Sequence, residues 1–358
     1  MTITLKNCSY GAHSFTGVDM MQVKMSAAFA AVSLCALPVT VSAAELNLYT
    51  TREPALIAPL LDAYTAKTGT KVNTVFLKDG LAERVASEGE ASPADILMAV
   101  DAGNLVDLAE KGVTQPIESA TLNAAIPEQL RDAKGYWFGL SMRARVLYAA
   151  KDVDLTAFNY EDLADPKWKG KICIRSGQHP YNTALFADYI AHYGEAKTEK
   201  WLSGVKDNLA RKAAGGDRDG AKDILGGVCD IAIANSYYVG LMRSGKGGED
   251  QVKWGEAIKV VLPTFKNGGT QVNISGAAVA KHAPNKAEAV KLLEYLVSDE
   301  AQKIYAEANY EYPVKAGASV DPIIASFGEL KIDSKPLAEI VGYRKEASAL
   351  VDKVGFDN

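Results

Sequence analysis

The chain has few cysteines, no cluster of basic residues and, after its first forty-odd residues, no apolar run long enough to cross a membrane. Its 358 residues include four cysteines, and 39 lysines and arginines face 44 aspartates and glutamates, which gives a formal net charge of −5. A nucleic-acid surface needs a basic patch, so we expect no nucleic-acid partner. The apolar content of 48% is typical of a globular protein, and the length suffices for two domains.

The motifs of several enzyme classes are also missing. His179, His192 and His282 show no zinc-binding spacing. Gly215-Gly216 and Gly268-Gly269 are not followed by the Lys-Ser/Thr of a phosphate-binding loop, and the sequence has no Gly-x-Ser-x-Gly nucleophile motif. We therefore expect a binding protein and not an enzyme. The alternative from another class is a secreted enzyme that uses tyrosine or glutamate as acid or base.

The first 43 residues are predicted to comprise an upstream extension and a secretory signal peptide that starts at Met21 or Met25. Lys24-Met25 precedes the apolar and small residues 26–37, and cleavage is expected after Ala43 or Ala44. The apolar run is too short for a membrane span, and Cys35 lies inside it without the ending of a lipoprotein signal. We expect secretion through a cleaved signal peptide into the periplasm.

Only two cysteines, Cys173 and Cys229, follow this segment. In an oxidising compartment an isolated pair is expected to form a disulfide, and two buried free thiols are the alternative. The disulfide would join the strand-like run 172–174 to the strand-like run 228–233, which leads to two adjacent tyrosines.

The rest of the chain alternates between strand and helix patterns, which indicates an α/β fold. The first unit is predicted to have strands at 45–50, 72–76 and 94–100, with helices at 54–68 and 81–88, and hence a parallel sheet with helices on both faces. The second unit is also α/β, and its predicted elements are strands near 172–174 and 231–234 and helices at 182–192, 198–209 and 219–226. A strand over 268–279 is expected to return to the first unit, and two helices and a mostly helical segment follow, at 286–297, 299–309 and 323–354.

Tyr237 and Tyr238 stand side by side at the end of the predicted strand 231–234. Phenolate oxygen is a hard anionic ligand, which suits hard, highly charged cations better than imidazole or thiolate does. Tyrosinate is also an established iron ligand. Because an ordinary phenol has a pKa near about 10, only a strongly Lewis-acidic cation would hold several phenolates at neutral pH. Taken alone, the pair also fits one core tyrosine beside one surface tyrosine.

Several segments resemble one family of secreted proteins. The run Asp162–Lys171 resembles a turn of the periplasmic solute-binding proteins of ABC importers. Four further segments resemble the ferric-iron-binding members of that group, so that the similarity covers essentially the whole chain after the signal peptide: 48–54, 139–146, 179–182 and 234–240.

The resemblance implies a two-lobed periplasmic binding protein of type II, with two strands crossing between the lobes and the ligand cleft at the hinge. Residues 44–142 and 270–318 would form the N-terminal lobe, and residues 143–269 and 319–358 the C-terminal lobe. The resemblance further implies a monomer that delivers its ligand to the permease of an ABC transporter in the inner membrane.

The resemblance also implies a metal site. By motif, Tyr181, Tyr237 and Tyr238 would hold Fe³⁺, and three phenolates would neutralise its charge. Where some relatives have a His-Tyr ligand pair after the first strand, this sequence has Glu53 and Pro54. The departure favours the subgroup that uses three tyrosines and an anion, although Glu53 is an alternative carboxylate ligand.

In that subgroup a synergistic anion, such as carbonate, completes the iron coordination. Arg52 and Arg143 are the expected charge partners of the anion, because the guanidinium fork matches a planar oxyanion. Arg145, Asn104 and Asn235 are weaker candidates for the surroundings. The expected function is periplasmic ferric-iron binding for an ABC importer. The alternative is a solute-binding protein for another small ligand: a polyamine, thiamine, phosphonate or another oxyanion.

Overall fold

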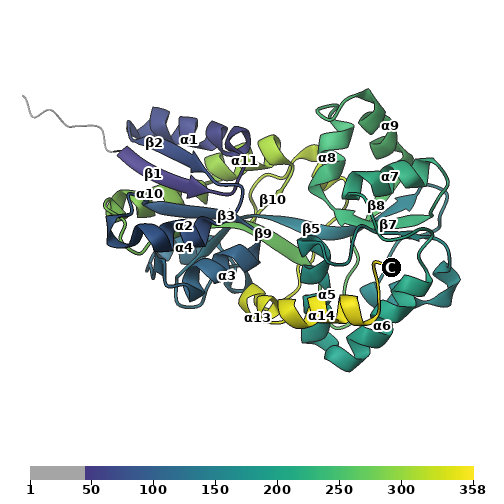
Figure 1. Cartoon of the computed structure of the whole chain (residues 1–358). Coiled ribbons are helices and arrows are strands. Elements are labelled where there is room, and N and C mark those ends of the chain that lie inside the picture. Colours follow the sequence, from purple (N-terminus) through teal and green to yellow (C-terminus); the bar gives the residue numbers. More distant parts are fainter. Residues whose placement is uncertain (1–44) are drawn as a thin grey trace, which may run out of the picture. The chain divides into compact units, whose positions relative to one another are not determined.

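The computed structural model describes residues 45–358, so the predicted signal peptide lies outside the described residues. Within this range no helix has both the length and the apolar character needed to cross a bilayer. The described part contains one mixed β-sheet with the strand order β2-β1-β3-β9-β5-β7-β6 and helices packed around it (Figure 1).

The first part of the chain forms the predicted alternation of strands and helices. Its elements are β1 (Glu45–Thr50), α1 (Pro54–Thr68), β2 (Lys71–Phe76), α2 (Leu81–Glu88) and β3 (Ile96–Val100). Strand β1 lies between β2 and β3 and is parallel to both. Helix α1 begins with Pro54, whose missing N–H costs nothing in the first turn, and ends at Gly69, whose φ of 74° is open to glycine.

Strand β5 (Phe138–Ala150) changes its pairing partner along its length. Its first half, to Ala144, pairs antiparallel with β9 (Val272–Ala280), and its second half, from Arg145, pairs antiparallel with β7 (Ile231–Asn235) and β8 (Ile258–Val261). The other edge of β9 pairs antiparallel with β3. The predicted parallel arrangement of β1, β2 and β3 is confirmed, and the returning strand β9 extends this sheet beside β3 in the antiparallel direction.

The remaining α-helices pack around this sheet, and three further short strands belong to it. In chain order they are α3 (Ala102–Glu110), β4 (Thr114–Gln115), α4 (Ala120–Ala125), β6 (Ile172–Cys173), α5 (Pro180–Tyr193), α6 (Glu195–Asp207), α7 (Asp217–Leu225), α8 (Tyr237–Arg243), α9 (Glu249–Ala257), α10 (Lys286–Leu296), α11 (Asp299–Asn309), β10 (Tyr312–Pro313), α12 (Pro322–Ala325), α13 (Leu337–Gly342) and α14 (Arg344–Lys353). The C-terminal helices α13 and α14, yellow in Figure 1, pack against α5. Tyr237 and Tyr238 begin helix α8 and do not end a strand.

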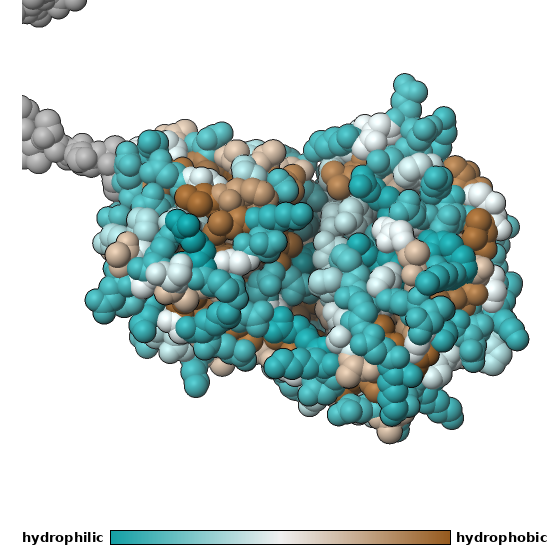
Figure 2. Space-filling view, viewed as in Figure 1, coloured by the Kyte–Doolittle hydropathy of each residue, from teal (hydrophilic) through white to brown (hydrophobic). Residues whose placement is uncertain are grey.

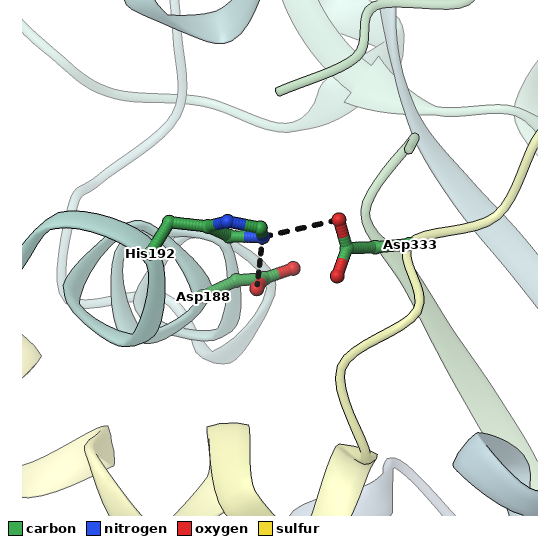
Figure 3. Close-up of side chains that lie close together, drawn as sticks. All are labelled: Asp188, His192 and Asp333. Carbon is green, nitrogen blue, oxygen red and sulfur yellow. Dashed lines mark hydrogen bonds and ion pairs between the residues drawn. The ribbon is translucent and has the colours of Figure 1, made fainter. Parts of the chain in front are cut away.

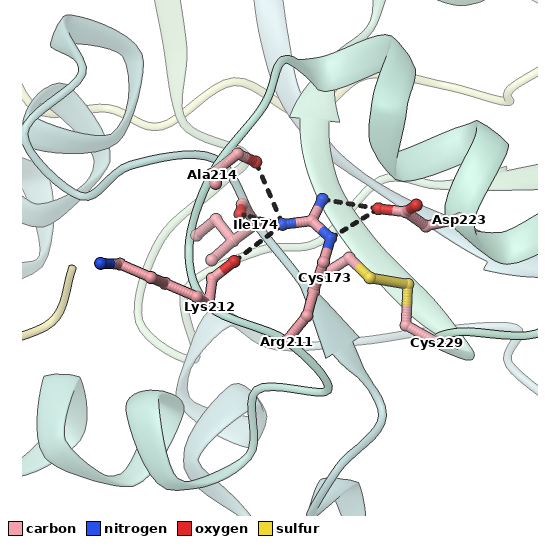
Figure 4. The surroundings of a disulfide bond; sticks show 7 residues. All are labelled: Cys173, Ile174, Arg211, Lys212, Ala214, Asp223 and Cys229. Atoms are coloured by element: carbon pink, nitrogen blue, oxygen red, sulfur yellow. Dashed lines mark hydrogen bonds and ion pairs between the residues drawn. A yellow bond between two sulfur atoms is a disulfide. The ribbon is translucent and has the colours of Figure 1, made fainter. Parts of the chain in front are cut away.

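The two cysteines form the predicted disulfide. Cys173 ends β6 and Cys229 lies just before β7, with their Cα atoms 5.9 Å apart (Figure 4). Beside the bridge, Arg211 contacts Asp223 at 2.6 Å. Arg211 also donates to three backbone carbonyls, those of Ile174, Lys212 and Ala214. The bridge and this arginine together fix the start of β7, the strand that leads to the tyrosines.

We expect the Cys173→Ser, Cys229→Ser double variant to lose about 2–4 kcal/mol of unfolding free energy, because the bridge restricts the unfolded chain across 56 residues. Guanidinium unfolding measures the change. A reductant should shift the midpoint of the wild-type protein toward that of the variant and leave the variant unchanged. Equal midpoints for the oxidised wild type and the variant would contradict the expectation.

Candidate metal centre

The buried guanidinium of Arg145 holds together three elements that surround the tyrosines. Its Nη1 donates to Asp217 Oδ2 on α7 at 2.6 Å, and its Nη2 donates to Asn182 Oδ1 on α5 at 2.6 Å. Asp217 Oδ2 also accepts the backbone N–H of Asn235, the last residue of β7, at 2.8 Å. Arg145 therefore has a structural role, and so has Asn235, whose side-chain oxygen accepts from the same guanidinium.

These contacts bring the hydroxyl groups of Tyr181 and Tyr237 close together. Tyr181 lies in the first turn of α5, where His179 Nδ1 accepts its backbone N–H at 3.2 Å, and Tyr237 is the first residue of α8. The two phenol oxygens are 3.3 Å apart. The Tyr238 ring lies against the Tyr237 ring, with a centroid separation of 4.2 Å. The three tyrosines predicted from the sequence therefore form one cluster.

Close packing behind α8 depends on Gly240. A Cβ atom at this position would lie 2.2 Å from Cγ of Tyr310, so any larger residue would push the helix and that ring apart. The absence of a side chain at Gly240 thus lets α8, which carries Tyr237 and Tyr238, lie directly on Tyr310.

A cavity of about 260 Å³ opens in front of Tyr181 and Tyr237. Its walls come from both ends of the sheet, and they consist of Thr51, Arg52, Glu53, Leu56, Val100, Arg143, Tyr181, Tyr237, Leu241 and Glu311. Five of the six predicted site residues thus line one cavity. The space-filling view in Figure 2 shows a surface hollow near the middle of the described part. The sixth, Tyr238, lines a neighbouring cavity of about 360 Å³ with Arg175 and Arg218.

Arg52 is buried and already paired. Its Nη1 donates to Glu311 Oε1 at 3.1 Å and to Ser275 Oγ at 2.8 Å. Burial alone would lower the pKa of Arg52, but the carboxylate of Glu311 outweighs burial and raises it. Burial alone would raise the pKa of Glu311, whereas Arg52, Arg143 and the hydroxyl of Ser141 together hold that pKa below its usual value.

Within the described residues, both arginines have a buried nitrogen without a hydrogen-bond partner, but in Arg52 it is Nε and in Arg143 it is the terminal Nη2. Arg143 Nη1 donates to Ser275 Oγ at 3.3 Å, while its Nη2 is buried, unpaired and 3.9 Å from Asp101 Oδ2. The guanidinium carbon lies 6.0 Å from the centre of the Tyr181 ring. An unpaired buried N–H costs free energy, so this nitrogen is a vacant donor for an anionic ligand.

Asp101, beside Arg143, has a strained backbone. Its φ of 98° is outside the range that residues with side chains ordinarily adopt. The conformation lets the carboxylate cap α3 by accepting the Gly103 N–H at 2.8 Å and also accept from Asn273 at 2.8 Å. Such strain is found preferentially at functional sites.

The phenols of Tyr237 and Tyr238 have raised pKa values and are protonated at neutral pH. Burial, and then the charges of Tyr238 and Tyr181, raise the pKa of Tyr237 well above its usual value. Burial and the charge of Tyr181 likewise raise the pKa of Tyr238. Burial and the charge of Arg175 lower the pKa of His179 to about 4, so its imidazole is neutral and can accept the Tyr181 N–H.

Two residues beside the cluster were not predicted. The guanidinium carbon of Arg175 lies 5.1 Å from the Tyr181 ring centre. Arg175 follows the predicted strand 172–174, and ligand-binding groups gather at such carboxyl ends, so the signal was available. Glu311 had no such signal, because it pairs with a residue 259 positions away. Asn104, a weaker candidate, donates to Val100 O at the end of β3.

We expect Glu311→Gln to lower the unfolding free energy by about 3 kcal/mol at neutral pH, because it leaves Arg52 buried without a counter-charge. The pKa of Glu311 is lowered in the folded state, so its contribution is complete above its unfolded pKa of about 4.3 and is lost as the pH falls through the folded pKa. Urea unfolding from pH 7 to pH 3 should therefore show the gap between wild type and variant narrowing in acid.

The matched control is Glu199→Gln, which removes an exposed pair with Lys353 and should leave stability nearly unchanged. A gap between wild type and Glu311→Gln that stays constant down to pH 3 would show that Glu311 is not the titrating group.

The family of bacterial extracellular solute-binding proteins matches residues 91–326. Iron uptake protein A2 of Synechocystis is 41% identical over 87% of this chain and 90% of its own. Among solved structures, the Bordetella ferric binding protein is 68% identical over 88% of this chain and 100% of its own, with a TM-score of 0.86. A Trichodesmium protein in complex with iron and citrate is 43% identical over 87% and 99%, with a TM-score of 0.82.

These relatives confirm the resemblance to ferric-iron-binding proteins that the sequence motifs indicated. They also agree with the α/β fold, since the structural matches extend over nearly the whole described part. The chain belongs to the bacterial extracellular solute-binding protein family, a family of binding proteins and not of enzymes.

Proposed function

We propose that this protein binds ferric iron in the periplasm through the phenolates of Tyr181, Tyr237 and Tyr238 and passes it to an ABC importer. The observation that carries the proposal is the 3.3 Å approach of the Tyr181 and Tyr237 hydroxyls at the wall of a cavity. Two phenol oxygens at this separation can both bind one cation, and phenolate is the protein ligand that best suits a hard trivalent ion. Relatives named as ferric-iron-binding proteins support the choice of cargo.

Tyr238 needs a small movement to join the other two tyrosines. Its ring already lies against Tyr237, and it is in the first turn of the same short helix, so a rotation of its side chain or of α8 would bring its oxygen to the cation. Three phenolates would then neutralise Fe³⁺, which removes the cost of holding a trivalent charge away from water.

An anion completes this site in our proposal. Arg143 has a buried Nη2 without a partner, and Arg52 lines the same cavity. Carbonate or a carboxylate such as citrate, which one relative holds together with iron, offers oxygens both to the cation and to Arg143. Glu53 also lines the cavity and is the alternative protein ligand.

We assign the boundaries of the two proposed lobes from the pairing of β5 and β9. We propose that these are the two crossing strands, with the predicted boundaries at residues 142/143 and 269/270. The first boundary lies close to the point where β5 changes from pairing with β9 to pairing with β7, between Ala144 and Arg145. Closure about such a hinge would bring the arginine wall of the cavity onto tyrosine-bound iron.

Adding ferric citrate should produce a visible phenolate-to-iron charge-transfer band at one iron per chain. Tyr181→Phe together with Tyr238→Phe should remove the band and weaken iron binding by more than about 100-fold, because the variant loses two anionic ligands. Tyr136→Phe, a tyrosine outside the cavity, is the matched control. Unchanged affinity in the double variant would refute the tyrosine site.

Iron affinity should also fall as the pH falls. The phenols of Tyr237 and Tyr238 are protonated without metal, so each must release a proton to bind iron, and acid reverses this exchange. A spectrophotometric titration from pH 8 to pH 4 measures the loss of the band. A band that persists unchanged to pH 4 would contradict phenolate ligation.

Replacing Arg143 by methionine should remove the dependence of iron binding on the anion, because the vacant N–H donor is lost. Iron affinity is measured with and without added bicarbonate or citrate. Arg84→Met, which breaks an exposed ion pair, is the control and should keep the wild-type dependence. An equal anion dependence in the Arg143 variant would exclude Arg143 as the anion partner.

A further inference from the structure

A second group of potential metal ligands lies on the other end of the helix that carries Tyr181. Asp188 and His192 are one turn apart on α5, and Asp333 lies in the segment before α13 (Figure 3). His192 Nε2 is 3.0 Å from Asp333 Oδ2 and 3.7 Å from Asp188 Oδ1. All three side chains are at least nine-tenths buried, with exposed fractions of 1%, 6% and 3% for Asp188, His192 and Asp333.

The carboxylate of Asp188 has no hydrogen-bond partner among residues 45–358. Both of its oxygens are fully buried and unpaired, and the side chain points toward His192 and Asp333. A buried carboxylate that makes no hydrogen bond is costly, and proteins ordinarily offset the cost by pairing or by metal coordination. The carboxylate of Asp333 lies within 4.8 Å, and two like charges so close together raise this cost further.

The number and spacing of the donor atoms fit a small divalent cation. His192 Nε2, one oxygen of Asp333 and one oxygen of Asp188 supply three donors, which all lie within 4.8 Å of one another. With metal–ligand bonds of about 2.0–2.2 Å, tetrahedral ligand atoms are roughly 3.3–3.6 Å apart. The observed separations of 3.0 and 3.7 Å need shifts of only a few tenths of an ångström.

The ligands are already held in position by their neighbours. Asp333 accepts backbone N–H groups from Gly269 and Lys335, each at 2.9 Å. The His192 ring stacks on Phe265, with a centroid separation of 4.3 Å. Hydrogen bonds to ligating carboxylates and an apolar wall behind the imidazole are the features that orient metal ligands.

We propose that Asp188, His192 and Asp333 form a structural site for a divalent cation of the zinc type, separate from the tyrosine cluster. Two carboxylates and a neutral imidazole balance a charge of +2, and a water molecule would take the fourth coordination position. The cation would tie α5 to the strand entry at Thr270, because Asp333 N–H donates to Thr270 O at 3.0 Å just before β9.

Without the cation, a proton on Asp188 would neutralise part of the negative charge of the cluster. Burial, and then the charge of Asp333, raise the pKa of Asp188 well above its usual value, so a proton would occupy the carboxyl. A proton and a cation therefore compete for the same oxygens, and a measurement of metal binding distinguishes them.

The test uses a Tyr181→Phe, Tyr237→Phe background, so that the tyrosine cluster cannot hold the probe metal. Chelator-stripped protein is dialysed against zinc chloride and the bound metal is measured by mass spectrometry. We expect one zinc per chain, a rise in the melting temperature on zinc addition, and, with cobalt(II) as probe, the visible absorption of a tetrahedral site. Asp188→Asn in the same background should lose the metal and the rise in melting temperature.

His282→Gln is the matched control, because His282 is an exposed histidine outside the cluster and should leave the bound zinc unchanged. Absence of bound zinc and of the cobalt spectrum in the background protein would overturn the proposal, whatever the fold of the Asp188 variant. Retention of the zinc by a folded Asp188→Asn variant would overturn it as well. Neither result bears on the iron band of the protein with intact tyrosines.

Discussion

The buried charge of Arg145 is the constraint on which the tyrosine cluster depends. Its hydrogen bonds reach α5 next to Tyr181, α7 through Asp217, and the end of β7 two residues before Tyr237. A guanidinium taken out of water must be matched in charge and in hydrogen bonds, and only one relative placement of these elements does so. The geometry of the two facing phenols therefore follows from the solvation of an arginine that lines no part of their cavity.

Arg52 and Arg143 differ in how far their positive charge is balanced within the protein. Arg52 is neutralised by Glu311 within the protein, whereas Arg143 retains an unpaired terminal nitrogen and has only a distant carboxylate at Asp101. The cavity consequently contains the phenol groups of Tyr181 and Tyr237 together with the guanidinium of Arg143, whose Nη2 has no hydrogen-bond partner among the described residues. A cation alone would meet this positive charge unfavourably, while a cation accompanied by an anion would match both walls.

Local patterns predicted the elements well and the long-range pairings poorly. Helix α1 was predicted at its observed bounds, because helical spacing, Pro54 and Gly69 are all local signals. The tyrosine pair was assigned to a strand end, because α8 is too short to show a period. The insertion of β9 beside β3 and the pairing of Glu311 with Arg52 depend on residues more than 170 positions apart, for which one sequence holds no local signal. The adjacency of Tyr237 and Tyr238 indicated a candidate metal site by itself, whereas Tyr181 was joined to them only by a motif resemblance.

The position of β9 also determines when the protein can finish folding. During synthesis from the N-terminus, β1, β2 and β3 are complete by Val100, but the open edge of β3 waits for residues 272–280. Strand β5 likewise lacks its partner on that side until the same segment appears. Most of the chain must therefore be made before either half of the sheet is closed, which delays compaction of the growing chain.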